Sequence, residues 1–597
     1  MINFLVTLLS ILAFSPGQLD EKKNSNPEIT AAEFQKHINF LASDELEGRF
    51  TGSEGSLKAG EYIESEFQNY GLEPFFNSDY FQEFPFVAEL EITENNSLAI
   101  QFGENTNYIN IVNDYTTSPF SDKLNYTGDL VFVGYGISAA DLDYDDYAGV
   151  DVQDKTVLIM RYHPEYDNPH SEYEKYSAFR YKATTARDKG AKAVIFVNGH
   201  LPKDSEDKLM KLRYDQAANV HSMGIVQVKR TIVDKLFHQA NLNFAEHQKN
   251  SSETKQPSSF VFKDVKIKLE TEIKEIIKTG RNVVGLLRGN DPELADEYVV
   301  IGAHFDHLGF GKTGSLYRGD DILIHNGADD NASGSAGLLE LAQKFADQKK
   351  MLKRNMIFIA FSGEELGLLG SAHFVKNSPV PTDQMIAMLN MDMIGRMDEN
   401  KLIVYGAGTS TKWKDVLNEL NHDNFKLTFH DEGYGPSDHT SFYGKAIPVL
   451  HFFTGAHPDY HRPSDDADKI NSTRAQQVIE YVYRIAKNVN NTSGEIDYVN
   501  IPQRQTSRRG FRVYVGTIPD YSENVKGLKI SGVSKDGPAE KAGLLGGDII
   551  IKFGEKEVSN IYDYTYALQD ATPGDIVDVV VIRNDKEMTF KVELGAR

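Results

Sequence analysis

Residues whose side chains can bind a metal ion follow apolar runs in the region 298–461. Each run predicts a buried strand, and ligands in open α/β sheets collect beyond the carboxyl ends of the strands. The candidate ligands at these strand ends and in the turns beside them are His304, Asp329, Glu365, Asp392 and His461. The chain has no cysteine, so any metal must be held by histidine and carboxylate groups. We therefore expect these side chains to converge on one site.

The number and charge of these ligands suit two Zn²⁺ ions. If Asp329 bridges the pair, one ion takes His304 and Asp392, and the other takes Glu365 and His461. A shared hydroxide would complete each coordination sphere. Three carboxylates and one hydroxide would then balance the charge of the two cations.

Two further carboxylates are expected to act beside the metals. Glu364 is adjacent to Glu365, and neighbouring side chains point apart, so Glu364 is free to take a proton from water as a general base. Asp306 lies two residues after His304, on the same face of an extended strand. It is predicted to hold the His304 imidazole in place, as carboxylates behind zinc-bound histidines do.

Spare histidines leave the ligand set open to exchange. Any of four could replace a predicted ligand, although an ordinary loop or hydrogen-bonding role is favoured for each; they are His307, His325, His439 and His457. His439, in the segment PSDHTSF, is expected to line the pocket.

The elements that must position this site lie mainly beyond Arg281, where long apolar strands alternate with helices. Such alternation predicts an α/β fold in which a mixed, mostly parallel sheet is flanked by helices. We assign residues 27–120 and 259–492 to this domain. Residues 121–258 are predicted to form an inserted α/β domain without a catalytic constellation, and residues 509–597 a separate β-rich module.

Five motifs together resemble the dizinc exopeptidase family of bacterial leucyl-type aminopeptidases, vacuolar aminopeptidase and glutamate carboxypeptidase. In chain order the motifs are AHFDH, GADDNASG, SGEELGLLGS, NMDMIGR and YHRPSDD. The segment FLASDELEGRFTGSEG is similar to the N-terminal part of that family. VFVGYG and GAKAVIFVNG resemble its protease-associated insert, and the C-terminal module resembles a PDZ domain of the bacterial protease type.

This resemblance implies a zinc exopeptidase fold and an aminopeptidase that hydrolyses N-terminal residues from peptides. It implies the same five zinc ligands, base catalysis by Glu364, orientation of His304 by Asp306, and a cis peptide between Asp329 and Asp330. A PDZ domain implies binding of a peptide C-terminus, near Tyr514–Ile518.

Composition limits the partners and the location. The net charge is −24 and no long basic run occurs, so nucleic acid is not an expected partner. An apolar stretch at 4–14, followed by small and turn residues, is too short to span a bilayer and predicts a signal peptide within residues 1–19; a buried helix is the alternative. We expect an exported protein, periplasmic or extracellular, without a stable membrane anchor.

Three other functions remain open. The same ligands would serve a carboxypeptidase or an aminoacyl cyclotransferase, and Arg396 is a candidate group for binding a substrate carboxylate in the first case. The chain could also be an inactive scaffold in which the insert and the PDZ-like module bind peptides.

Overall fold

The computed structural model describes residues 27–596 apart from short gaps, and the predicted signal peptide lies outside the described residues. The gaps are 140–141, 169–170, 202–205, 215–222, 320, 495, 502–512, 520–524, 526, 535–536, 559–563, 565–566 and 569–570.

The central sheet of the first domain is mixed, as predicted, and the strands at its centre are parallel. Its order is β1 (Glu73–Pro74), β13 (Ile273–Leu287), β15 (Asn355–Phe361), β14 (Tyr298–His304), β16 (Met385–Met391), β19 (Val449–Phe453), β17 (Lys401–Tyr405) and β18 (Lys426–Phe429). β15, β14, β16 and β19 run parallel to one another, whereas β13 and β17 join them in antiparallel fashion. Every residue of β14 and β15 is buried, which explains their unbroken apolar runs.

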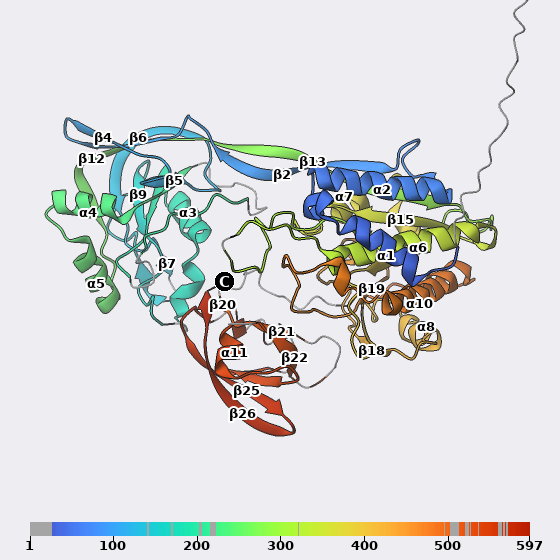
Figure 1. The fold of residues 1–597 in the computed structure, drawn as a ribbon. Helices are drawn as coiled ribbons and strands as arrows, with labels where there is room; N and C mark the ends of the chain where they lie inside the picture. Colours follow the sequence, from blue (N-terminus) through green and yellow to red (C-terminus); the bar gives the residue numbers. More distant parts are fainter. Residues whose placement is uncertain are drawn as a thin grey trace, which may run out of the picture.

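Helices cover both faces of this sheet (Figure 1). One face packs against α1 (Ala31–Leu41), α2 (Glu54–Tyr70), α6 (Gly334–Asp347), α8 (Trp413–Glu419) and α10 (Ser472–Asn491). The other face packs against α7 (Leu369–Lys376) and α9 (His439–Tyr443). Helix α6 is buried over its whole length to Ala346.

A long two-stranded ribbon connects this domain to the insert. β2 (Phe81–Ile92) pairs with β13 along most of its length, and Figure 1 shows the ribbon running from the central sheet to the second domain. The insert has its own eight-stranded sheet. Its order is β4 (Asn105–Ile109), β3 (Ser97–Phe102), β12 (Phe260–Thr271), β6 (Leu124–Phe132), β9 (Thr156–Met160), β10 (Ala193–Val197), β11 (Gly224–Val228) and β5 (Tyr115–Thr117).

This sheet corrects the predicted domain limits. The strands at 97–117 and β12 were assigned to the catalytic domain, but they pair with strands of the insert. The chain enters the insert through β2 and a short turn at 93–96, and it leaves through β12, which is followed after Glu272 by β13. Helices α3 (Phe179–Asp188), α4 (Arg230–Gln239) and α5 (Phe244–Thr254) complete the insert, and β7 (Ser138–Ala139) pairs with β8 (Tyr144–Asp145) beside them.

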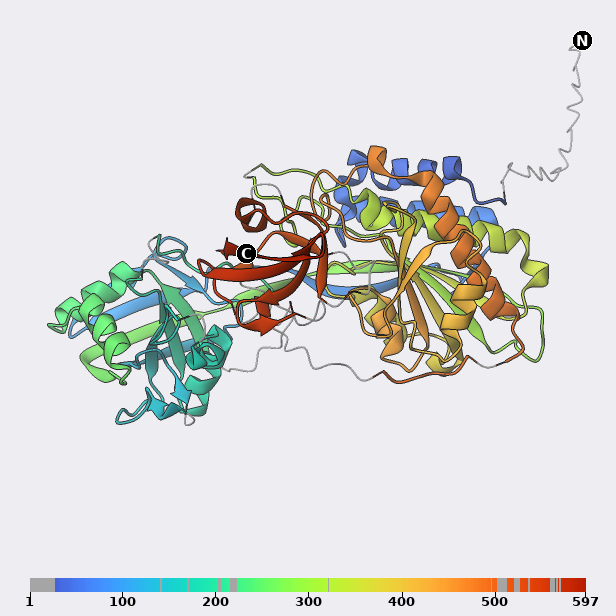
Figure 2. The same ribbon diagram turned by 90° about the horizontal axis from the view of Figure 1, so that it is seen from below.

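The C-terminal module is β-rich, as predicted. It contains β21 (Thr517–Pro519), β22 (Leu528–Val533), β23 (Ile549–Phe553), β24 (Lys556–Glu557), β25 (Ile576–Arg583) and β26 (Lys586–Glu593), with α11 (Pro538–Ala542) packed on β26. β20 (Val513–Tyr514) pairs with β27 (Gly595–Ala596) at one end. Both views place this module between the insert and the catalytic domain (Figures 1 and 2).

Within the described part of the chain, no helix has the length and apolar character needed to cross a lipid bilayer.

Candidate metal centre

The parallel strands bring three of the predicted residues to one edge of the central sheet. His304 is the last residue of β14 and is level with Phe361 at the end of β15, after which Glu364 follows. Gly302 of β14 is level with Asn390 of β16, so Asp392 lies beside His304. The register of the sheet therefore brings together side chains that are far apart in sequence.

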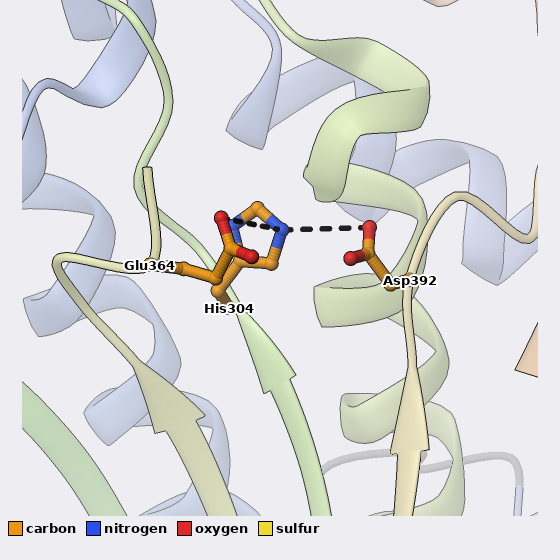
Figure 3. A group of neighbouring side chains, drawn as sticks. All are labelled: His304, Glu364 and Asp392. Carbon is orange, nitrogen blue, oxygen red and sulfur yellow. Dashed lines mark ion pairs between the residues drawn. The ribbon is translucent and has the colours of Figure 1, made fainter. Parts of the chain in front are cut away.

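His304 lies at the centre of a first cluster. Its Nε2 atom is 3.4 Å from Asp392 Oδ1 and 3.9 Å from Glu364 Oε2, and Figure 3 shows the imidazole between these two carboxylates. Asp330 contributes a third carboxylate, with Oδ1 at 3.5 Å from the same nitrogen. The donor atoms of His304, Glu364 and Asp392 all lie within 4.8 Å of one another, a spacing that a single metal ion can span.

A second cluster surrounds Glu365. His461 Nε2 is 3.2 Å from Glu365 Oε2 and 3.2 Å from Asp330 Oδ2. His307 Nδ1 is 2.7 Å from the other Glu365 oxygen. His307, one of the spare histidines, is therefore part of this cluster. The sequence signal for it was its position as the last residue of the metal motif AHFDH.

Asp330, not Asp329, joins the two clusters, so the prediction that Asp329 bridges is wrong. The two Asp330 oxygens face His304 and His461, whereas Asp329 Oδ1 accepts a hydrogen bond of 2.6 Å from the Gly395 amide. The other Asp329 oxygen is 3.2 Å from His457 Nε2. The cis peptide is also one residue later than expected, between Asp330 and Asn331.

Asp465 explains why the turn presents Asp330. Its carboxylate accepts hydrogen bonds from the backbone amides of Asp329 and Asp330 at 3.0 and 3.1 Å. Gly327 begins the turn in the left-handed region, with φ of 57°. The conformation of the turn therefore depends on a residue 136 positions away in sequence. The rule that neighbouring side chains point apart could not predict which of the two aspartates faces the clusters.

Asp306 lies behind His304, but its backbone makes the closer contact. His304 Nδ1 is 3.2 Å from the Asp306 carbonyl oxygen and 3.8 Å from its carboxylate. A carbonyl only accepts, so Nδ1 donates and the Nε2 lone pair faces the cluster. The Asp306 carboxylate instead accepts from Thr51 Oγ1 at 2.8 Å and from the Glu364 amide at 3.2 Å. It therefore holds the backbone of Glu364.

Glu364 and Glu365 have pKa values displaced in opposite directions. Burial raises the pKa of Glu364, His304 opposes this, and Glu365 and Asp392 raise it further, so that it lies well above its usual range. Burial would also raise the pKa of Glu365, but His461 and His307 hold it well below its usual range. Neighbouring carboxyl groups separated in this way are suited to different roles, one to proton transfer and one to a permanently charged contact.

Arg49 supports the site from behind and was missed by the sequence reasoning. The side chain is fully buried, where burial lowers its pKa to about 10. It donates hydrogen bonds to the carbonyl oxygens of Phe305 at 2.7 Å and Gly327 at 2.9 Å, which belong to the motifs AHFDH and GADDNASG. The loop SDELEGRFTGSEG therefore supports both motifs through Arg49. An arginine in a polar loop is usually exposed, so the residue type did not indicate that Arg49 would be buried beside the site.

His439 is buried in a different environment from the clusters. It is the first residue of α9, and its ring stacks on His451 with a centroid distance of 4.5 Å. Burial holds the pKa of His439 well below its usual range, so the ring is neutral. Its neighbour Asp438 is also buried, which raises its pKa to about 7. His325 lies in the loop before Asp329, with Nε2 at 2.7 Å from Ser315 Oγ.

The donor set fits divalent cations. The carboxylates of Asp330, Glu364, Glu365 and Asp392 are all largely shielded from solvent, and their nearest partners are histidines. Concentrating buried negative charge in this way is costly unless cations compensate it. Imidazole nitrogens and carboxylate oxygens are the donors that zinc takes when no thiolate is present.

Comparison with known proteins matches three parts of the chain to families. Residues 282–486 match peptidase family M28, residues 126–236 match the PA domain, and residues 506–594 match the PDZ domain. These matches confirm the resemblance inferred from the motifs.

Individual relatives are similar at low identity. Aminopeptidase YwaD of Bacillus subtilis is 26% identical over 359 residues, covering 58% of this chain and 64% of that protein. Leupeptin-inactivating enzyme 1 of Streptomyces exfoliatus is 30% identical over 200 residues, covering 33% of this chain and 41% of that protein. The chain thus spans less than two thirds of each of these relatives. The solved structure of an aminopeptidase from Aneurinibacillus sp. strain AM-1 has a TM-score of 0.46 at 24% identity, covering 80% of this chain and 97% of that chain.

Residues 282–486, which carry both clusters, therefore form a peptidase domain of family M28, joined in this chain to a PA domain and a PDZ domain.

Proposed function

We propose that the chain is an exported aminopeptidase that binds two zinc ions and removes N-terminal residues from peptides. His304, Asp392 and one oxygen of Asp330 would hold the first ion; His461, Glu365 and the other oxygen of Asp330 would hold the second. The observation that carries this proposal is the position of Asp330, whose two oxygens face His304 at 3.5 Å and His461 at 3.2 Å. Such a carboxylate is suited to bridging a pair of cations.

Zinc is supported by the names of related proteins as well as by the donors. A relative from Pyrenophora teres, 38% identical over 113 residues, is named a probable zinc metalloprotease. When bound, a zinc pair polarises the substrate carbonyl and makes a water molecule acidic enough to attack at neutral pH.

Glu364 is the group proposed to move the proton. Its carboxylate lies beside His304, its amide donates to Asp306, and its raised pKa suits a base that must accept a proton and then release it to the leaving amine. The ionised Glu365 would stay with the metal. Tyr460 stacks on His461 with a centroid distance of 3.9 Å; burial and nearby carboxylates keep its pKa well above the usual range, so its hydroxyl retains the proton needed to donate to a substrate oxygen.

Arg396 favours an aminopeptidase over a carboxypeptidase. A carboxypeptidase needs a cationic group for the free carboxylate of its substrate, and Arg396 was the candidate. Both terminal nitrogens of Arg396 lie 3.2 Å from Asp459 Oδ2. The charge of the arginine is therefore already matched within the protein.

The end of the peptide that is cut can be tested with paired substrates. We expect the zinc-loaded enzyme to hydrolyse a leucyl peptide with a free amino terminus and to leave its acetylated counterpart intact. Hydrolysis of the acetylated peptide from its carboxyl end would contradict the proposal, as would conversion of an N-terminal glutaminyl peptide to a cyclised product without hydrolysis. If the purified protein holds no metal and converts none of these peptides, the alternative of an inactive peptide-binding scaffold would instead be favoured.

The remaining modules would serve the same function. The PA domain is proposed to shape access of the peptide, and the PDZ domain to bind a peptide C-terminus near Tyr514–Ile518. Export to the periplasm or outside the cell follows from the proposed signal peptide, and cell fractionation would test it.

A further inference from the structure

The loop before the metal turn holds His461 directly. His461 Nδ1 is 3.0 Å from the Gly314 carbonyl oxygen, so Nδ1 donates to it, and the Leu316 amide donates to the His461 carbonyl at 2.9 Å. His461 itself has φ of 55°, in the left-handed region that a non-glycine residue rarely adopts. The turn at 314–316 therefore holds both the ring and the backbone of this proposed ligand. A bond to the second ring nitrogen is also what directs Nε2 toward a metal.

The holding loop has little structure of its own. The described residues of 305–327 form no helix or strand. Gly314 is exposed, and its φ of 80° lies in the left-handed region. Because it belongs to no helix or strand, no regular hydrogen-bond ladder restrains it. Ser315 Oγ lies 2.7 Å from His325 Nε2 and accepts from the Tyr317 amide at 3.0 Å, and these contacts close one side of the turn. A contact on the other side adds a further restraint.

That other side meets the PDZ domain. The guanidinium carbon of Arg318 lies 4.6 Å from the centre of the Tyr514 ring, a distance at which a cation is attracted to an aromatic face. Tyr514 is in turn fixed within its domain, because its strand pairs with Gly595 and its half-buried side chain lies against Gly516 and Gly537. The loop thus contacts a residue of a different domain at Arg318, two residues after Leu316.

We propose that Tyr514 of the PDZ domain is a positioning residue for the metal ligand His461, acting through Arg318 and the turn at 314–316. This inference rests on the proposed metal-binding role of His461. The PDZ domain then has a second role besides peptide binding: it completes the support of one metal site. Loss of an exposed cation–π contact changes an equilibrium by about two- to fivefold, which is the size of effect expected on zinc retention.

The test follows release of zinc to a chromogenic chelator from the full chain. The phase that belongs to the His461 site is identified as the one missing in His461→Ala. Tyr514→Ala and Arg318→Ala should each accelerate this phase by about two- to fivefold, and the double variant should be no faster than the single ones. Tyr514→Phe keeps the ring and should behave like the wild type. Lys312→Ala removes an exposed cation from the same loop and is the matched control.

Hydrogen exchange provides a readout that does not depend on bound metal. In the metal-free protein, a peptide containing the Leu316 amide should exchange faster in Arg318→Ala, which leaves the interior of the PDZ domain untouched. Wild-type release and exchange rates in both single variants would overturn the inference, and so would effects that simply multiply in the double variant. A wild-type chain that binds fewer than two zinc ions would count against the proposed function, whereas the exchange experiment would still judge the contact.

Discussion

Glu364 and Glu365 are adjacent in sequence, yet their carboxylates belong to different clusters. Glu364 Oε2 lies 3.9 Å from His304 Nε2, and Glu365 Oε2 lies 3.2 Å from His461 Nε2. Their pKa values move apart as a result, upward for Glu364 and downward for Glu365. This separation is the physical basis for assigning proton transfer to one residue and metal binding to the other.

Glutamine substitutions at the two positions should therefore have different effects. Glu364→Gln keeps the size of the side chain but cannot accept a proton, so kcat should fall about a hundred- to ten-thousandfold with zinc content unchanged. Glu365→Gln should instead lose one zinc ion. Peptide hydrolysis and metal analysis on the same samples decide this, and full activity in Glu364→Gln would refute the base assignment.

Arg49→Lys should destabilise the protein by weakening the hydrogen bonds that support the site. A lysine has a single nitrogen and cannot reach all the carbonyl oxygens that Arg49 satisfies, so buried acceptors lose their donors. We expect the free energy of unfolding to fall by about 2–4 kcal/mol, measured by denaturant titration. Arg288→Lys is the matched control, because Arg288 is exposed and pairs with Glu73 at the surface. Equal effects of the two substitutions would show that Arg49 has no special role.

Glu340 predicts a pH dependence of stability that is separate from the metal site. Burial and the neighbouring Glu33 raise the pKa of this carboxyl group to about 8, from 4.5. Because the folded state binds the proton more tightly than the unfolded state, protonated Glu340 contributes to the stability of the fold. This contribution to stability is complete below pH 4.5 and is lost as the pH rises through 8. Glu340→Gln should therefore gain stability relative to the wild type between pH 5 and pH 8, by about 1–3 kcal/mol. A constant difference between the two proteins across this range would contradict the shift.

The strands and the residues at their ends could be predicted because burial on both faces leaves unbroken apolar runs. The runs that end at His304 and Asp392 correspond to β14 and β16. The choice between Asp329 and Asp330 could not be made in this way, because it depends on Asp465, which belongs to a distant turn. The limits of the insert were misplaced for a related reason: they depend on pairing between strands far apart in sequence, because β12 pairs with β3 and β6.

Zinc content in two neighbouring asparagine variants tests the central claim most directly. Asp330→Asn removes the charge that faces both His304 and His461. Asp329→Asn changes a contact with Gly395 and His457 outside the clusters. Metal analysis of the purified proteins should find two zinc ions per chain in the wild type, close to two in Asp329→Asn, and one or none in Asp330→Asn. Loss of zinc in Asp329→Asn together with a full complement in Asp330→Asn would contradict the bridging role of Asp330.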